Sequence, residues 1–155
     1  MAGSDTVTAK KLLPPSYLFF SILLMVGLNF VLPLVKGIDY PWSLLGCVPL
    51  LTGIVLNLIA DRAFKRAGTT VKPFEESSVL ITSGVFRISR HPMYLGMVLI
   101  ILGIAMVMGT LTPFFVIPVF VLLIQNRFIA VEERMLEARF GSKWLDYKMC
   151  VRQWF

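Results

Sequence analysis

Four long apolar blocks, separated by short polar segments, dominate the pattern along the chain. They cover residues 16–35, 42–60, 93–108 and 111–130. A bilayer core about 30 Å thick needs roughly 20 apolar residues in a helix that rises about 1.5 Å per residue. The blocks therefore predict an all-α, polytopic membrane bundle with four transmembrane helices, built as a single domain over residues 1–155.

Helix-ending residues divide the second half of the chain. Gly109 and Thr110 leave almost no connection between the third and fourth blocks, so we predict a tight antiparallel hairpin there. The fourth helix is expected to continue beyond the membrane to about Phe140. Gly141 suits the left-handed position that ends a helix, and Ser142 is expected to cap a short further helix.

Glycines recur seven residues apart in two of the blocks. Gly46 and Gly53 form one pair, and Gly96 and Gly103 form the other. At 3.6 residues per turn each pair lies on one helix face, which predicts close approach of a neighbouring helix. The first stripe continues to Asn57 and turns polar. We favour the interpretation that this face of the helix packs against a neighbouring helix over the interpretation that it forms a binding site.

The composition agrees with a membrane protein. Hydrophobic residues make up 57% of the chain and charged residues only 15%, whereas soluble domains carry about 25% charge. This excludes disordered and collagen-like chains and an ordinary cytosolic enzyme. The two cysteines, Cys47 and Cys150, exclude a disulfide scaffold and are expected to be free thiols.

All but one of the 15 Lys and Arg residues lie in the N-terminal tail, in segment 61–92 or after residue 124. By the positive-inside rule these segments and both termini face the cytoplasm. The first block is too long for the apolar core of a signal peptide, so we expect it to remain as a span of a multi-pass protein of the bacterial inner membrane. Because the basic residues flank apolar blocks, they are read as topology signals and predict no nucleic-acid partner.

The polar chemistry is concentrated at the cytoplasmic side, in loop 61–92 and tail 131–155. His91 precedes Pro92 at the predicted start of a helix, where free N–H groups favour a carboxylate ligand. Arg90 and His91 binding lipid phosphates is the alternative. Glu132 and Glu133 follow the fourth block and suit the two hydroxyls of a ribose, or else they form ion pairs. One histidine and two distant cysteines predict no metal site.

Several stretches, in this order and spacing, resemble the superfamily of isoprenylcysteine carboxyl methyltransferases and phospholipid methyltransferases. They are residues 80–87 (LITSGVFR), residues 90–96 (RHPMYLG), the Glu132-Glu133 pair, and the later Leu136, Phe140, Gly141, Tyr147, Val151 and Trp154. The resemblance covers roughly residues 60–155, and residues 67–74 also look like the small bacterial-type members.

The resemblance implies S-adenosylmethionine (SAM) as the methyl donor, held at the cytoplasmic end by the loop and the helical tail, with S-adenosylhomocysteine as product. It implies a hydrophobic or lipid-like acceptor and the bilayer as partners. Of the acidic pair, Glu132 aligns better with the cofactor-contacting acid of the family. The residues matching the family's cofactor-binding positions are Val79, Leu80, Ile81, Phe86, His91, Pro92, Met93, Tyr94, Glu132 and Glu133.

The chain departs from the family where the acceptor is recognised. In the isoprenylcysteine enzymes an arginine shortly before the acidic pair holds the substrate carboxylate; here Phe128 stands at that position, beside Arg127. We expect Arg127 and Asn126 to orient the substrate, with no dedicated general base. An isoprenylcysteine-type carboxylate, a phospholipid amine and a thiol all remain open as acceptors. A small four-span transporter and a non-catalytic membrane scaffold are the alternative functions, and the oligomeric state is not predicted.

Overall fold

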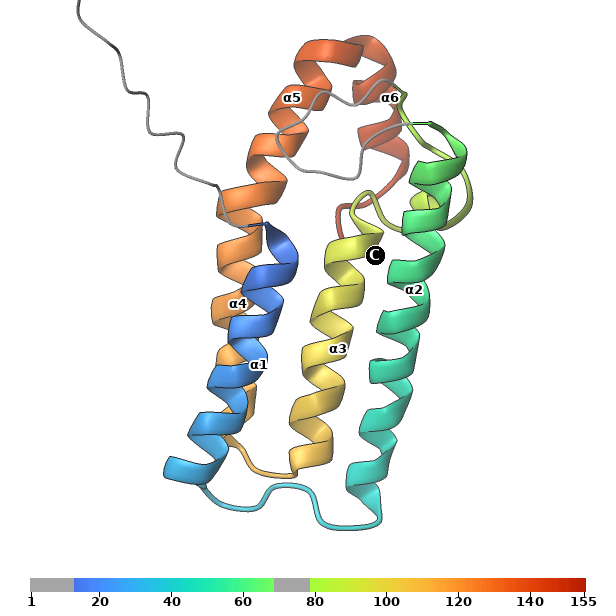
Figure 1. Ribbon diagram of the computed structural model, residues 1–155. Helices are drawn as coiled ribbons and strands as arrows, with labels where there is room; N and C mark the ends of the chain where they lie inside the picture. Colours follow the sequence, from blue (N-terminus) through green and yellow to red (C-terminus); the bar gives the residue numbers. More distant parts are fainter. Residues whose placement is uncertain (1–12, 69–78) are drawn as a thin grey trace, which may run out of the picture.

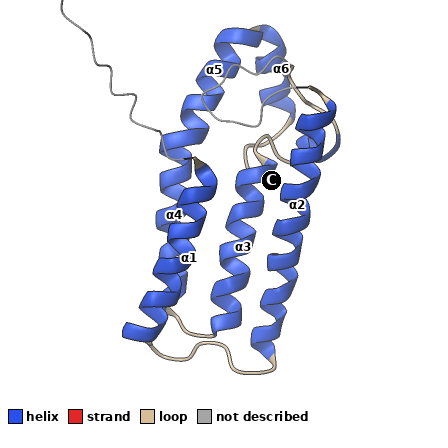
Figure 2. Cartoon of the chain, in the orientation of Figure 1, coloured by secondary structure: helices blue, strands red, loops and turns tan. Residues whose placement is uncertain are grey.

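The computed structural model describes residues 13–68 and 79–155, and most residues in these ranges are helical. Long helices run side by side, and a short helical tail folds over one end of them (Figure 1). No strand forms in these ranges; a single antiparallel bridge joins Lys36 to Thr110 (Figure 2). The predicted all-α class is therefore confirmed. The elements are α1 (Pro14–Val31), η1 (Trp42–Gly46), α2 (Cys47–Arg66), η2 (Gly84–Arg87), α3 (Pro92–Met108), η3 (Thr112–Phe115), α4 (Val116–Ile124), η4 (Gln125–Ile129), α5 (Ala130–Phe140) and α6 (Ser142–Cys150).

The first helix is shorter than the apolar block that predicts it. It starts at Pro14 and ends at Val31, whereas the block runs to residue 35. Leu32 leaves helical geometry (φ −135°, ψ 65°) because the residue before a proline, here Pro33, disfavours the α region. Beyond it, the Leu34 N–H donates to Thr112 Oγ1 at 3.1 Å, which ties this connection to the start of the fourth helix.

The two glycine stripes meet each other, and they hold α2 against α3. A Cβ atom built on Gly46 would lie 2.6 Å from the carbonyl oxygen of Gly103, and one built on Gly53 would meet the carbonyl oxygen of Gly96. No side chain fits in such a gap, so the two backbones cross in direct contact. The predicted close approach is confirmed, and each stripe is the partner of the other.

The connection between α3 and the next helix is as short as predicted. Gly109 ends α3 with φ +72°, and η3 begins at Thr112. The helix after this connection runs to Phe140, as expected, but it contains a π-helical turn, η4. Gly141 has a positive φ of 53° with ψ −124°. It occupies the N-cap position of α6, and Ser142 is the first residue within that helix. The prediction that Ser142 caps α6 is therefore wrong.

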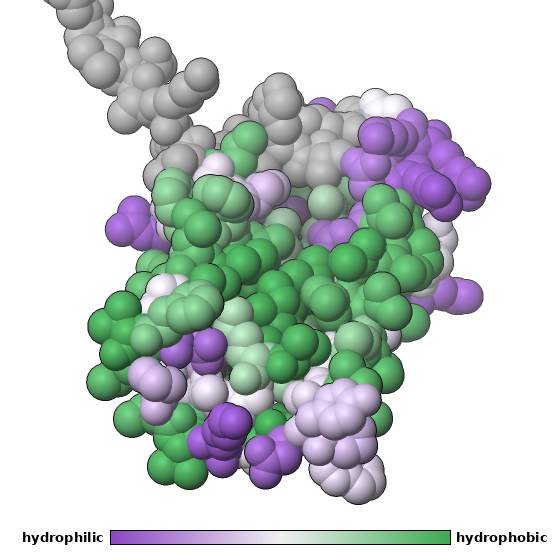
Figure 3. All heavy atoms as spheres, turned by 60° about the horizontal axis from the view of Figure 1, so that its bottom comes forward, coloured by the Kyte–Doolittle hydropathy of each residue, from purple (hydrophilic) through white to green (hydrophobic). Residues whose placement is uncertain are grey.

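The helices present apolar surface along their length. Within the part of the chain that the structure describes, three are long and apolar enough to cross a membrane: Pro14–Val31, Trp42–Arg66 and Thr112–Phe140. Helix α3 is equally apolar but has 17 residues, so the fourth span stays a prediction. On the face shown in Figure 3, hydrophobic residues dominate the surface between the two ends of the bundle, and hydrophilic ones gather toward the ends.

Candidate functional site

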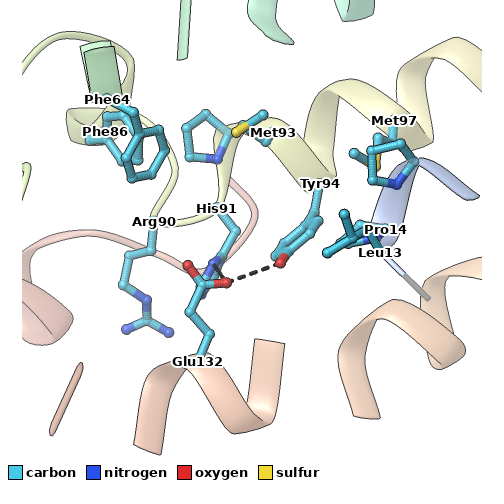
Figure 4. A pocket seen from close by; sticks show the side chains of 12 residues that line it. Leu13, Pro14, Phe64, Phe86, Arg90, His91, Met93, Tyr94, Met97 and Glu132 are labelled. Atoms are coloured by element: carbon cyan, nitrogen blue, oxygen red, sulfur yellow. Dashed lines mark hydrogen bonds and ion pairs between the residues drawn. The ribbon is translucent and has the colours of Figure 1, made fainter. Parts of the chain in front are cut away.

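A cavity of about 170 Å³ opens at the end of the bundle where α6 and the C-terminus lie. The start of α1, the end of α2, η2, the start of α3 and α5 all contribute to it, so segments far apart in sequence meet there (Figure 4). Its walls are mostly apolar, with a polar side formed around one carboxylate. The lining residues are Leu13, Pro14, Pro15, Phe64, Phe86, Arg90, His91, Pro92, Met93, Tyr94, Met97 and Glu132.

The polar side is built around His91. Its Nε2 lies 3.2 Å from Glu133 Oε1, and its Nδ1 lies 3.8 Å from Glu132 Oε2. The Tyr94 hydroxyl donates to the same Glu132 oxygen at 3.1 Å. The imidazole thus stands between two adjacent carboxylates, with only 4% of the residue exposed.

Local sequence explains why His91 is held so firmly. Pro92 is the first residue of α3, so His91 occupies the N-cap, and its carbonyl accepts from the Leu95 N–H at 3.1 Å. The His91 N–H donates to Ser89 Oγ at 3.2 Å, and that hydroxyl donates to the carbonyl of Gln153 at 2.9 Å. The chain turn before α3 is therefore fastened to the C-terminal segment.

Arg90 connects the cavity to the tail. Its Nη2 lies 3.0 Å from Glu133 Oε1, its Nη1 donates to the Lys148 carbonyl at 3.1 Å, and its guanidinium lies over the Trp144 ring at 5.8 Å. Only 8% of the side chain is exposed, and Nε is buried without a hydrogen-bond partner in the described ranges. A buried guanidinium with a spare donor is suited to an anion.

The second carboxylate belongs to this ion cluster and not to the cavity wall. Glu133 lies beyond the apolar block 111–130. Burial raises its pKa, but the His91 hydrogen bond and the charges of Arg90, His91 and Lys148 outweigh this effect and lower the pKa below its usual range. Lys148 Nζ lies 3.6 Å from Glu133 Oε2. Glu133 therefore stays ionised and balances the cations behind the site.

Aromatic and thioether side chains form the apolar side. Phe64 and Phe86 pack edge to face with ring centroids 5.4 Å apart, and they come from α2 and η2. Met93 and Met97 lie one turn apart on α3. Such a surface accepts a flat ring system or the end of an apolar chain.

The helical tail supports this wall from behind. Trp144, Tyr147 and Val151 form a small buried cluster, against which Leu80 and Leu136 pack. The Tyr147 hydroxyl donates to the Phe86 carbonyl at 2.6 Å. Burial raises the pKa of Tyr147 to about 12, against the opposing charge of Arg90, so the hydroxyl remains a donor.

Six of the predicted cofactor-binding residues reach the cavity: Phe86, His91, Pro92, Met93, Tyr94 and Glu132. Glu133 lies behind His91. The structure does not bring Val79, Leu80 or Ile81 to this cavity. Val79 is 45% exposed, Leu80 packs on the Trp144 cluster, and Ile81 borders a second cavity. The hypothesis that Arg90 and His91 bind lipid phosphates at the surface does not hold, because both side chains are buried against carboxylates.

The two residues predicted to orient the substrate lie elsewhere. Asn126 and Arg127 fall within the π turn η4 and are exposed, while the next residues, Phe128 and Ile129, are buried. The wider turn puts an extra residue into the helix, which changes the side-chain register of the α5 residues after it. Glu132, which follows this turn, faces the cavity, whereas Asn126 and Arg127 do not line it.

Sequence reasoning missed Phe64, Met97 and the prolines of α1 as cavity residues. A signal existed for Phe64, because it lies eleven residues after Gly53, close to three turns, and so shares the glycine face of α2. Met97 follows Met93 by four residues, which is also one helix face. No periodicity indicates that Pro14 and Pro15 lie near these side chains.

The fold and this site define a helical protein with helices long and apolar enough to cross a membrane and with a cavity at its basic end. Residues 42–143 match the family described as phospholipid methyltransferase. A 62-residue stretch is 37% identical to an uncharacterised protein of Haemophilus influenzae; it covers 40% of this chain and 98% of that protein.

Among solved structures, the chain is similar to the eukaryotic intramembrane Ras methyltransferase, isoprenylcysteine carboxyl methyltransferase. The TM-score is 0.68 at 25% identity, and the match covers 91% of this chain and 51% of the other. The chain thus spans about half the length of that enzyme. On the family match over 42–143, the chain belongs to the phospholipid methyltransferase family, and the predicted superfamily is confirmed.

Proposed function

We propose that the protein is a SAM-dependent methyltransferase that methylates a hydrophobic or lipid-like acceptor at the cytoplasmic face of the membrane. The observation that carries this proposal is that Arg90 and Glu132 both line one cavity whose other walls are mostly apolar. Family membership supports methyl transfer, and the basic residues around this end support its cytoplasmic orientation.

The residues present fit SAM group by group. Arg90 offers a buried, unpartnered Nε–H for an amino-acid carboxylate. Glu132 has Oε2 engaged by Tyr94, and the described contacts leave Oε1 to accept from ribose hydroxyls. Phe64 and Phe86 provide an apolar wall for adenine. When bound, SAM supplies a methyl group activated on a sulfonium.

The protein's own contribution is alignment and exclusion of water. His91, held by Ser89 and the two carboxylates, and Tyr94, held by Glu132, form a rigid polar wall at one side of the cavity. Met97 and Pro14 line its apolar side, which leads toward the spans and suits an acceptor arriving from the bilayer. In-line methyl transfer to a carboxylate or thiolate then requires the acceptor to be correctly positioned, and it requires no general base. Asn126 and Arg127 lie at the outer surface of η4, and their role in orienting the acceptor stays a prediction.

Equilibrium titration with S-adenosylhomocysteine tests the proposal. The detergent-purified protein should bind it, and Glu132→Gln should weaken binding by about tenfold or more, because a hydrogen bond to a charged group contributes about 1.5–3 kcal/mol. His91→Ala should also weaken it. Asp146→Asn, which changes an exposed carboxylate of α6, is the matched control and should bind as wild type.

Incubation with radiolabelled SAM and total membrane extract then tests the reaction. A labelled lipid-like product supports the enzyme. Binding without any transfer would instead indicate the non-catalytic scaffold, and no binding by folded wild-type protein would reject the cofactor site.

A further inference from the structure

A second cavity, of about 490 Å³, lies between the last turns of α2 and the chain turn before η2. It is separate from the first, because Phe64 and Phe86 face the first cavity while their neighbours Ala63 and Val85 face the second. Its lining residues are Ile59, Arg62, Ala63, Arg66, Ala67, Ile81, Ser83, Gly84 and Val85.

Two cations and a hydroxyl face this cavity. Arg62 and Arg66 are four residues apart on one face of α2. Across residues 13–68 and 79–155 neither forms an ion pair, whereas Lys65, which does not line the cavity, pairs with Asp61 at 2.6 Å. The Ser83 side chain, at the N-cap of η2, makes no capping hydrogen bond. These donors suit a phosphate.

The same face of α2 is apolar and exposed where it enters the predicted membrane. Val48, Val55 and Ile59 are exposed, and the helical repeat puts them in line with Arg62 and Arg66. A ligand at this place would therefore have an anionic head at the arginines and a long apolar part along the helix.

The described lining favours an anionic headgroup. Its charged side chains, Arg62 and Arg66, are both cations, which attract a phosphate and repel an ammonium group. We propose that the cavity binds the phosphate of an anionic phospholipid such as phosphatidylglycerol, with its acyl chains along Val48, Val55 and Ile59. This lipid is distinct from the methyl acceptor.

Competitive lipid retention tests this assignment without relying on the proposed activity. Detergent-purified protein is incubated with equal amounts of phosphatidylglycerol and phosphatidylcholine, and the lipid retained per chain is counted by native mass spectrometry. Wild type should retain phosphatidylglycerol in preference. An Arg62→Gln, Arg66→Gln double variant should lose roughly thirtyfold in apparent affinity, since each arginine near an anionic surface contributes about fivefold.

Lys65→Gln is the matched control, because it removes one cation from the same turn but not from the cavity. The Lys65→Gln variant should change lipid retention by less than about twofold. If it lost as much affinity as each arginine substitution does, the proposal would be overturned in favour of diffuse surface charge. Competition by glycerol 3-phosphate as effective as the lipid itself would reject a lipid site in favour of a soluble phosphate. Loss of S-adenosylhomocysteine binding in the double variant would also overturn it, by assigning the cavity to the cofactor. Thermal unfolding in the same detergent checks that the variants, which alter exposed side chains, remain folded.

Discussion

Glu132 and Glu133 are adjacent in the chain but serve different partners. Glu132 accepts from Tyr94 on the cavity wall, while Glu133 contacts Arg90, His91 and Lys148 behind it. Successive helical residues point about 100° apart. One carboxylate can therefore meet a ligand while the other neutralises the cations that hold the site together.

Replacing Glu133 with Gln should destabilise the protein by about 2 kcal/mol at neutral pH, because buried charge-assisted hydrogen bonds are lost. The pKa of Glu133 is lowered in the folded state, so its stabilisation is fully present above the unfolded pKa of about 4.3 and is lost as the pH falls through the folded pKa. Thermal unfolding of wild type and variant should therefore converge only once the pH falls below the folded pKa, which is lower than the unfolded value. Glu137→Gln, an exposed acid 3.9 Å from the same Lys148, is the control and should cost much less. Equal losses for the two variants would contradict this role for Glu133.

Sequence reasoning could place these acids and His91 at one membrane depth, because each adjoins the end of an apolar block. It could not assign their separate roles. That division depends on η4, where Phe128 and Ile129 are both buried and the helical register changes. Nothing in the apolar pattern of 111–130 signals a π turn. Asn126 and Arg127 were expected at the site because they neighbour Phe128, the position aligned with the family's arginine, and they lie outside the cavity.

At the scale of elements, the crossing of α2 and α3 positions the cavity. The glycine stripes permit backbone contact from Gly46 to Gly96. The same crossing brings Phe64, at the end of α2, to the level of Met93 at the start of α3. The seven-residue spacing was enough to predict both stripes. Which helix each stripe contacts depends on three-dimensional packing, and the early end of α1 depends on Pro33.

Gly53→Ala should destabilise the protein by about 1–3 kcal/mol, because its Cβ would meet the Gly96 carbonyl and force the helices apart. Gly27→Ala is the matched control. It makes the same change within α1, where a Cβ would meet nothing within 4 Å, and helix propensity predicts a gain of up to about 1 kcal/mol. The midpoints of thermal unfolding of the two variants and of wild type, recorded in the same detergent, measure both changes in stability. A Gly53→Ala protein as stable as Gly27→Ala would show that the crossing is not in tight contact.

At the scale of the whole molecule, the C-terminal segment closes the basic end of the bundle. Its hydrogen bonds to the turn before α3 include Tyr147 to Phe86, Gln153 to Ser89, and the Arg152 carbonyl to the Arg90 N–H at 3.1 Å. The tail was predicted to be helical and to belong to the site. Its partners could not be predicted, because these bonds are to backbone groups that carry no sequence signal.

Tyr147→Phe isolates the contribution of this closure. It removes the 2.6 Å hydrogen bond to the Phe86 carbonyl but keeps the ring within its cluster with Trp144. A net hydrogen bond contributes about 1 kcal/mol, so local opening of the turn should become about fivefold more frequent. Amide hydrogen exchange of residues 85–90 should rise by that factor, while exchange in the middle of α3 stays unchanged. Tyr40→Phe, an exposed tyrosine in the connection between α1 and α2, should leave both regions as in wild type. If exchange rose equally throughout α3, the bond would stabilise the bundle as a whole and not the wall of the cavity.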